Sequence, residues 1–327
     1  NLFPGRQNER PPDGAASGSP VSSTVGPTRR GPAAKPNRHC QIPQNLVHSA
    51  KLCTISCGIS LDSSALQQAP DLLRLFFNDL QNLHGAALHA DACEIYTDVD
   101  GVYTADPRYV KKARKLAEIT YDEMLDLASL GAGVLHNRSV EMAKKYGVQL
   151  VVRSSLNNHE GTIVREEVNM EKMLVSGVAA DKNATRIAVI GLKDEPGIAF
   201  HLFNALAKYN INVDIILQSV GRNGTKDISF TVAEDEADEA VAIIQKSFPK
   251  SEYNKIDEEK DVAKISIVGA GMMTHPGVAA SMFEALYDAG VNIKMISTSE
   301  IRVTVLIDEK YTEKALNAVH DKFALGD

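Results

Sequence analysis

The segment RIAVIGLKDEPGIAFHLFNALAKYNINVDI (residues 186–215) returns later in the chain as KISIVGAGMMTHPGVAASMFEALYDAGVNIKM (residues 264–295). Both copies run from an apolar stretch through glycine and a Pro-Gly pair to a helical apolar pattern and an asparagine. From the Pro-Gly pair onward the two copies stay 80 residues apart, as Pro196 and Pro276 show. A repeated strand–turn–helix–strand unit predicts two similar small modules in one chain.

Each module is predicted to have the order β-α-β-β-α of a ferredoxin-like α+β fold. We place the first module at residues 173–260 and the second at residues 261–327. The helical period of the first copy predicts that Phe200 faces the core of its module. The second copy ends without a last strand, and residues 173–178, which precede the first copy, are predicted to supply that edge strand.

Residues 86–169 have a different pattern, in which short apolar strands alternate with helices. This pattern predicts an α/β fold with a parallel sheet. Residues 93–97 (CEIYT) and 148–152 (VQLVV) are the expected buried strands. The loop DVDGVYTADPR (residues 98–108) follows the first strand and carries acids and glycine. Open α/β sheets place their ligands at the carboxyl ends of strands, so this loop is a candidate binding site.

Residues 1–85 differ from the rest of the chain. The first 35 residues are rich in Pro, Gly, Ser and Arg without helical or strand periodicity, which predicts disorder. The chain begins at Asn1 and its first methionine is Met124. We therefore expect residues 1–85 to be an artefact joined to natural coding sequence, with a genuine unusual extension as the alternative.

The overall composition is that of a soluble globular protein, with 44% hydrophobic and 24% charged residues. A net charge of -7 argues against nucleic-acid or acidic-membrane partners. The sequence contains no stretch of 18 apolar residues, so no membrane span is predicted. Cys40, Cys53, Cys57 and Cys93 have neither disulfide-framework nor zinc spacing, which fits a reducing cytoplasm and singles out no metal-binding residues.

Three long motifs in the correct order resemble one known family. They are CEIYTDVDGVYTADPR (93–108), LASLGAGVLHNRSVEMAKKYGVQLVVRSS (127–155) and the doubled IGLKDEPGIAFHLFNALAKYNINVDIILQS (190–219). Over residues 86–327 the chain closely resembles aspartate kinase. The resemblance implies the C-terminal part of an amino-acid-kinase domain followed by two ACT domains. The family uses ATP and Mg²⁺ to convert L-aspartate to 4-phospho-L-aspartate, the step that opens the route to lysine, threonine and methionine. The end products of this route inhibit the family.

On that resemblance a nucleotide pocket lies at the candidate loop. Backbone N–H groups and an arginine would meet phosphate charge, and the acids of the loop would hold Mg²⁺ or its waters. No catalytic residue is assigned. The residues that the resemblance places in the ATP pocket are Thr97, Asp98, Tyr103, Thr104, Ala105, Asp106, Pro107 and Arg108.

The repeated turn of the modules suits a small amino acid. In Asp194-Glu195-Pro196-Gly197 the start of a helix offers N–H groups to a carboxylate, while Asp194 and Asp214 could answer an ammonium group. The resemblance implies pairing of the modules between subunits of a homo-oligomer, with L-lysine as the first expected effector and L-threonine as the second. The implied effector contacts are Asp194, Asn212, Val213, Asp214, Gln218, Val278, Ala279, Asn292, Ile293, Ser299 and Glu300.

The sequence departs from the family in one respect. The Lys-Phe-Gly-Gly-Ser/Thr and Gly-Arg-Gly-Gly-Ser-Asp motifs of the kinase domain do not occur in it. Without glycine-rich loops and the charge-stabilising lysine little barrier reduction remains, so this chain alone is not expected to be catalytically competent. Two interpretations follow: an aspartate kinase whose N-terminal third is damaged or replaced, or a non-catalytic regulatory subunit. Met170 or Met173 could start such a subunit.

Overall fold

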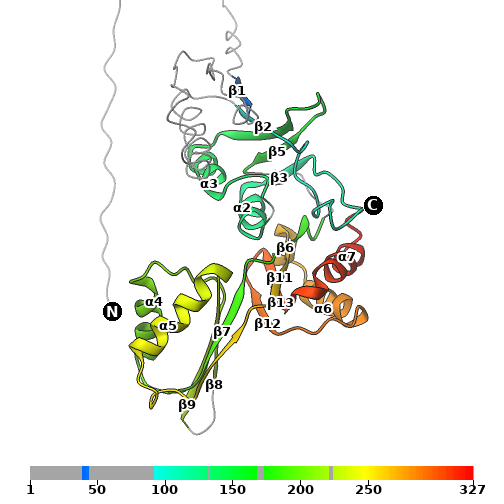
Figure 1. Ribbon diagram of the computed structural model, residues 1–327. Helices are drawn as coiled ribbons and strands as arrows, with labels where there is room; N and C mark the ends of the chain where they lie inside the picture. The colour runs from blue at the N-terminus through cyan, green and yellow to red at the C-terminus, as the bar shows by residue number, and fades with distance from the viewer. Residues whose placement is uncertain (1–38, 44–91, 132, 168–172, 221–223, 327) are drawn as a thin grey trace, which may run out of the picture. The chain divides into compact units, whose positions relative to one another are not determined.

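The computed structural model describes residues 39–43, 92–131, 133–167, 173–220 and 224–326 (Figure 1). The expectations for residues 1–85 therefore lie outside the described residues, except at 39–43. In these five residues the backbone forms β1 (His39–Pro43), which pairs in parallel with the next strand. No helix of the described residues is long and apolar enough to cross a membrane.

The α/β part, residues 39–43 and 92–167, is built on a five-stranded sheet with the order β1-β2-β4-β5-β3. Pairs β1–β2, β2–β4 and β3–β5 are parallel, but β4 and β5 are antiparallel, so the predicted all-parallel sheet is mixed. The antiparallel pair arises because a short loop joins its two strands, whereas a parallel pair needs a long crossover. The strands after β1 are β2 (Ala92–Thr97), β3 (Glu118–Thr120), β4 (Gln149–Ser154) and β5 (Thr162–Arg165).

The described residues of the α/β part also form the helices α2 (Tyr121–Ser129) and α3 (Asn137–Tyr146). Thr120 and Glu123 form a reciprocal capping box that starts α2. His136 is the N-cap of α3 and accepts a hydrogen bond from Arg138 N, which gives this histidine a structural role. The core of this part includes the fully buried side chains Ile95, Ile119, Met124 and Leu150.

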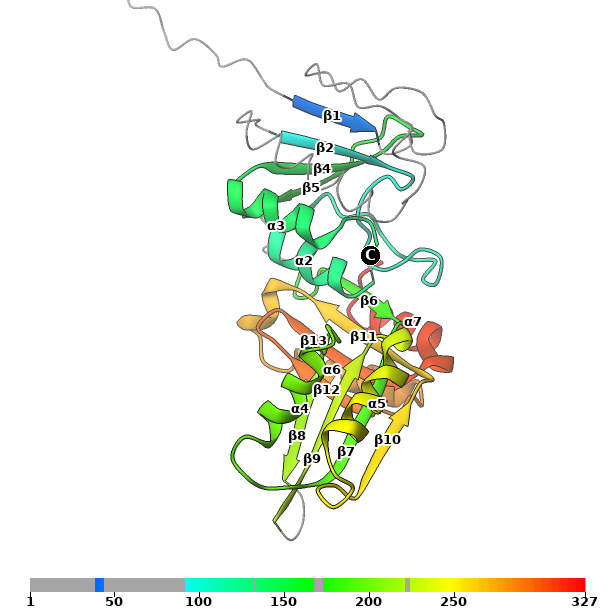
Figure 2. The ribbon, with the colours of Figure 1, turned by 60° about the vertical axis from the view of Figure 1, so that its left-hand side comes forward.

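The first module has a four-stranded sheet in the order β10-β7-β9-β8, with its two helices on one face (Figure 2). All its neighbouring strands are antiparallel. Among the residues that the structure describes, its core, which includes Ile187, Leu202 and Phe230, is formed by residues of the module itself. The elements are β7 (Thr185–Lys193), α4 (Ile198–Ala207), β8 (Ile216–Val220), β9 (Thr225–Val232), η2 (Glu234–Glu236), α5 (Ala237–Ser247) and β10 (Lys255–Glu259).

One core residue of this module was predicted wrongly. Phe200 is 65% exposed, although the helical period placed it inward. Helix α4 buries Leu202 and Leu206, with Phe203 packed partly against the same core. A position two residues before Leu202 lies on the opposite side of a 3.6-residue helix, so the core accepts the 202/206 face and excludes Phe200.

The second module repeats this arrangement in the order β12-β13-β11-β6. Its edge strand β6 is supplied by the chain segment that precedes the first module, at Gly177–Asp181 rather than at 173–178. The two modules are therefore interleaved, and the range 173–260 contains a strand that belongs to the second sheet. The other elements are β11 (Val262–Val268), η3 (Ala270–Met273), α6 (Val278–Asp288), β12 (Met295–Thr298), β13 (Arg302–Asp308), η4 (Glu309–Tyr311) and α7 (Thr312–Lys322).

A buried carboxylate joins the second module to the α/β part. Glu123 on α2 is 1% exposed. Its Oε1 accepts hydrogen bonds from Ser176 Oγ at 2.6 Å and from Ala270 N at 2.9 Å. Its Oε2 serves the capping box through Thr120. One side chain thus starts α2, fixes the segment leading into β6 and closes the end of β11.

Candidate functional site

The 98–117 loop leaves the sheet at the carboxyl end of β2, beside the end of β4. Thr97, the last residue of β2, is buried, and its Oγ1 accepts a hydrogen bond from Val99 N at 2.9 Å. Ser155, just past β4, donates from its N to Thr97 O at 2.8 Å. Because β2 and β4 are parallel, the loops after them begin at the same edge of the sheet, where α/β folds place ligands.

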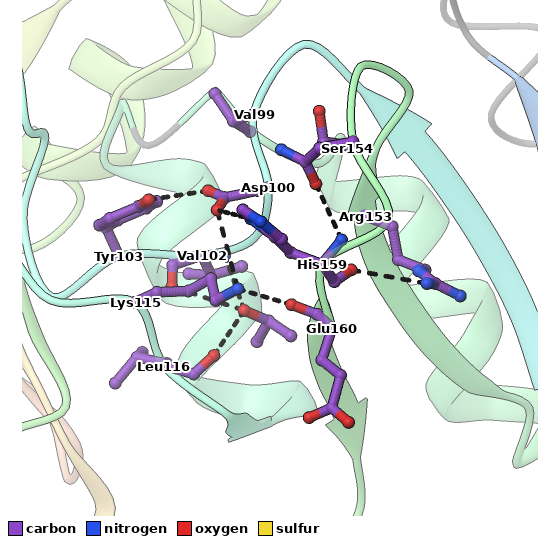
Figure 3. Close-up of polar contacts among 12 residues, drawn as sticks. Val99, Asp100, Val102, Tyr103, Lys115, Leu116, Arg153, Ser154, His159 and Glu160 are labelled. Carbon is purple, nitrogen blue, oxygen red and sulfur yellow. Dashed lines mark hydrogen bonds and ion pairs between the residues drawn. The ribbon is translucent and has the colours of Figure 1, made fainter.

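Asp100 is the centre of a polar cluster between these two loops (Figure 3). Tyr103 OH donates to its Oδ1 at 2.7 Å, while Lys115 Nζ and His159 Nδ1 lie 3.7 and 3.8 Å from its Oδ2. Lys115 also donates to Glu160 O at 2.5 Å. The bond from Tyr103 is the main cause that lowers the pKa of Asp100, and it raises the pKa of Tyr103. Asp100 is thus an ionised group that ties the two loops together.

Thr162 holds the two arms of the 98–117 loop together. Its buried Oγ1 accepts from Val102 N at 2.8 Å and donates to Leu116 O at 2.6 Å. Gly101 has φ +153°, and a Cβ built there would lie 2.5 Å from Thr162 Oγ1. Only glycine allows the backbone to approach Thr162 this closely in that conformation. The loop is therefore shaped by its attachment to β5.

The loop tip presents a cation. Arg108 is 82% exposed in its side chain and pairs with Asp106, its NH2 lying 2.7 Å from Oδ2. The Asp106 carboxylate also accepts from Arg108 Nε at 2.9 and 3.0 Å and from Arg108 N at 2.8 Å. Burial opposes ionisation of Asp106, but the bonds from Arg108 outweigh it and its pKa lies below the usual value. The guanidinium is held in place and still faces solvent, as a phosphate contact requires.

The predicted nucleotide residues divide by their surroundings. Asp98, Pro107 and Arg108 are exposed, and Tyr103 and Asp106 are half-buried. Thr104 and Ala105 are buried against the second module: Thr104 contacts His320 of α7, and Ala105 belongs to the core of that module. The contact of these two side chains with ATP stays a prediction, and their positions favour a supporting role.

The Pro-Gly turns of the two modules have the same backbone geometry. Gly197 precedes α4 with φ +96° and ψ -9°, and Gly277 precedes α6 with φ +96° and ψ -7°. The left-handed conformation favours glycine at both places. Neither helix start has a side-chain cap, and in α4 Ile198 N donates to Glu195 O at 3.4 Å. The other N–H groups of the two first turns can face an anion.

A cavity borders each turn. The one at the first turn has a volume of about 520 Å³ and is lined by Pro196, Ile198 and His201, together with the charged residues Lys193, Glu195 and Lys208. The one at the second turn has about 570 Å³ and is lined by Pro276, Gly277, Val278 and Ser281, with Arg114 and Lys322. Either volume can hold an amino acid, and cations line both cavities.

The two acids expected to bind an ammonium group already have lysine partners. Asp194 pairs with Lys226 at 2.7 Å. Asp214 pairs at 2.7 Å with Lys264, which lies at the same distance from Asp181. Although burial disfavours the charge of Lys264, the hydrogen bonds that it donates to both carboxylates raise its pKa. A ligand ammonium at either acid would therefore compete with a lysine.

The other predicted effector contacts fall into two regions. Val278 and Ala279 begin α6, while Asn212, Val213, Asn292 and Ile293 precede the edge strands β8 and β12. The strand-start regions of the two modules meet, because Ile215 and Met295 share a small core. Gln218 lies in β8, and Ser299 and Glu300 form the exposed turn after β12. The predicted effector contacts at the start of α6 therefore lie apart from those at the edge strands β8 and β12.

Three residues at these sites were missed by reasoning from the sequence. Lys226 and Lys264 are partners from distant strands, and no local pattern marks them. Asp100 could have been found, because the D-x-D-G opening of the loop puts a carboxylate next to a required glycine.

Comparison with known proteins gives two family matches. Residues 187–248 and 265–323 match the ACT domain, and residues 71–154 match the amino acid kinase family. The second match begins before residue 86, where we had set the start of the kinase-like segment. Both ACT matches lie within the modules defined by the sheets.

Relatives match over most of this chain. The aspartokinase of Helicobacter pylori is 50% identical over 244 residues, which are 73% of this chain and 60% of the relative. The crystal structure of Clostridium acetobutylicum aspartate kinase has a TM-score of 0.68 at 27% identity, covering 75% of this chain and 57% of that one. E. coli aspartokinase III, in complex with aspartate and ADP, has a TM-score of 0.65 at 25% identity, with 75% and 55% covered.

The present chain spans about 60% of the length of the curated relatives that it matches. The matched portion contains the end of an amino acid kinase domain and both ACT domains, in the order that the sheets show. On these matches, the chain belongs to the aspartokinase family.

Proposed function

We propose that this chain carries the C-terminal part of an aspartate kinase, which transfers the γ-phosphoryl group of ATP to the side-chain carboxylate of L-aspartate. The observation that carries the proposal is the 98–117 loop: it begins at the carboxyl end of β2, is tied to β5 through Thr162 and exposes a held arginine. The E. coli relative was crystallised with aspartate and ADP, which agrees with this substrate pair.

The residues of the loop fit a nucleotide in specific ways. Arg108 can meet phosphate charge and Asp98 offers an exposed carboxylate to Mg²⁺ or its waters. Asp100 fits a metal poorly, because Tyr103, Lys115 and His159 already surround its oxygens. When bound, Mg²⁺ neutralises charge between the phosphates. The part played by the described residues is to position the nucleotide.

An assay of the full chain tests the kinase proposal. We expect MgATP binding, detected by calorimetry, to weaken in Arg108→Ala by about 1.5–3 kcal/mol if the guanidinium bonds to phosphate. Lys111→Ala removes another exposed cation of the same loop and serves as the control. L-aspartate-dependent release of ADP then tests turnover. Equal MgATP affinity in all three proteins would remove Arg108 from the site.

The second candidate function is a regulatory, amino-acid-binding chain without catalysis. It is favoured by the absence of the glycine-rich kinase motifs from the sequence and by the presence of both complete modules. Effector binding without MgATP binding would support this candidate. MgATP binding with ADP release would support the kinase.

The effector proposed for the modules is L-lysine, with L-threonine as the alternative. Uncapped helix starts and nearby cations suit the α-carboxylate, while Asp194, Asp214 and Glu300 provide negative charge for ammonium groups. Calorimetric titration of the full chain with each amino acid separates the two. Saturation by neither would reduce the modules to a structural role.

The modules are also proposed to join subunits in a cytoplasmic homo-oligomer. Two large apolar side chains are exposed on edge strands: Ile216 on β8 at 53% and Ile296 on β12 at 42%. Exposed edges can pair with another chain. Sedimentation velocity of Ile216→Lys should show a smaller species than the unmodified chain. Tyr287→Lys, which alters an exposed side chain on α6, is the control.

A further inference from the structure

Thr104 lies in the middle of the 98–117 loop and is fully buried. Its backbone N donates to Arg114 O at 2.8 Å, and its backbone O accepts from Val178 N on β6 at 2.8 Å. Its Oγ1 accepts from Arg114 N at 3.0 Å and lies 3.0 Å from Nε2 of His320 on α7. This residue of the loop is therefore bonded both to the returning arm of the loop and to two elements of the second module.

The neighbouring loop residues follow Thr104 into the second module. Ala105 and Val110 belong to the same core cluster as Leu316 of α7. Asn317 Nδ2 on that helix donates to Tyr109 O at 3.1 Å. The two arms of the loop pack in a different core, because Val102 and Leu116 belong to the core of the α/β part. The loop is thus shared between two hydrophobic cores.

His320 is the polar group that α7 contributes to this junction. Its side chain is fully buried, and its Nδ1 has no hydrogen-bond partner among the described residues. Among the described residues, the polar contact of the His320 side chain is therefore the one with Thr104. A buried imidazole with a single partner depends strongly on that bond. Burial lowers the pKa of His320, which keeps the ring neutral at neutral pH.

We propose that His320 is a positioning residue for the nucleotide loop: through Thr104, helix α7 of the second module sets the place of the loop tip, Asp106–Arg108. This inference rests on the proposed nucleotide function of the loop and assigns one part of its regulation. Thr104 stands two residues before Asp106, so a shift of α7 reaches the tip through a short, buried connection.

Hydrogen exchange of the full chain tests the connection without any ligand. In His320→Leu and in Thr104→Val, we expect the amides of Thr104, Arg114 and Val178 to exchange roughly 2- to 10-fold faster, the effect of losing one ordinary hydrogen bond. Thr104→Val also removes the acceptor of Arg114 N, so the Arg114 amide responds to that change directly. At the amides of Thr104 and Val178 the double variant should add little to the larger single effect, because both changes remove the Thr104–His320 contact. Thr104→Ser, which keeps the hydroxyl, should restore slow exchange.

Thr312→Val is the matched control, since Thr312 is a buried, hydrogen-bonded residue of the same helix whose Oγ1 donates to Glu309 O. In this variant the amides of Thr104, Arg114 and Val178 should exchange as in the unmodified chain. Unchanged exchange in His320→Leu would overturn the proposal. If that variant does not fold, His320→Gln together with Thr104→Val decides the question by the same amides.

MgATP affinity then separates this inference from the proposed function. We expect His320→Leu to weaken MgATP binding about 2- to 10-fold, with L-lysine binding unchanged. Faster exchange in a chain that binds no MgATP would support the positioning role and count against the nucleotide function. Weakened MgATP binding with unchanged loop exchange would reject His320 as the positioning residue while leaving the nucleotide function in place.

Discussion

The two modules have the same fold and the same Pro-Gly geometry, but they close the strand before the turn in different ways. In the first module Gly191 N donates to Asp227 of the neighbouring strand β9 at 2.8 Å. In the second module Ala270, which follows Gly269, the counterpart of Gly191, donates from its N to Glu123 of the α/β part at 2.9 Å. The first module thus holds this segment through its own sheet, and the second depends on a carboxylate from a different part of the chain.

The same contrast appears in the cores and edges. The core of the first module uses its own residues, and its edge strand β10 follows α5. The second module takes its edge strand β6 from before the first module and accepts loop residues Ala105 and Val110 into its core. Duplication thus produced two similar folds with different attachments. The second module is attached to the α/β part, whereas the first contacts the second through Asp214–Lys264 and the small core of Ile215 and Met295.

Removing the carboxylates of Glu123 and Asp227, one variant at a time, should give the largest difference between the modules. Glu123→Ala leaves donors from three residues without their buried acceptor, so we expect a loss of about 3 kcal/mol or more in the free energy of unfolding. Asp227→Ala removes one part-buried acceptor and should cost about 1 kcal/mol. Urea unfolding followed by hydrogen exchange measures both. Equal losses would contradict an asymmetric attachment.

The basic residue next to each edge strand offers a second, smaller test. Lys264 in the second module is 7% exposed in its side chain and lies 2.7 Å from two carboxylates, whereas Arg186 in the first is 20% exposed, at 3.3 and 3.7 Å. We expect Lys264→Met to cost about 2 kcal/mol, because Asp181 and Asp214 lose their shared partner. Arg186→Met should cost about 1 kcal/mol or less. Thermal unfolding of both variants checks the order.

The pH dependence of stability should also distinguish the modules through His320. Burial lowers the pKa of His320 below the usual histidine value of about 6.5, while Asp321 raises it and Lys112 lowers it by smaller amounts. Because the unfolded state then binds the proton more readily, the stabilisation is complete above about pH 6.5 and is lost as the pH falls below that value. The slope from one histidine is at most about 1.4 kcal/mol per pH unit.

His320→Gln removes this titrating group and should flatten the loss between pH 7 and pH 5. The measurement is urea unfolding at each pH, with exchange of α7 amides as the local readout. His201→Gln in the first module, where the histidine is exposed, is the control and should leave the slope unchanged. A slope that is the same in all three proteins would show that His320 does not carry this dependence.

The sequence predicted what is local and repeated, and failed where distant residues decide. The Pro-Gly turns, the two β-α-β-β-α orders and most strands follow from periodicity in short windows. The outward turn of Phe200, the mixed sheet and the lysine partners of Asp194 and Asp214 depend on packing between distant segments. Likewise, no local signal shows that Thr104 is directed into the second module.

The smallest expected effect concerns effector binding at the first turn. Asp194→Ala should weaken binding of the effector about 2- to 5-fold if the carboxylate meets a ligand ammonium at this exposed site. Thr274→Ala changes the position 80 residues later, where the second module has no acid, and is the matched control. Calorimetric titration with L-lysine measures both variants.

Lys226→Ala sharpens the same test, because it removes the lysine that holds Asp194 at 2.7 Å. If Asp194 binds the ligand, freeing it should tighten L-lysine binding, whereas the double variant with Asp194→Ala should lose that gain. If Lys226→Ala instead weakens binding, the lysine itself contacts the ligand carboxylate and the acid only positions it. The first module would then bind the carboxylate of its effector through a cation, which agrees with the cations that line both turn cavities.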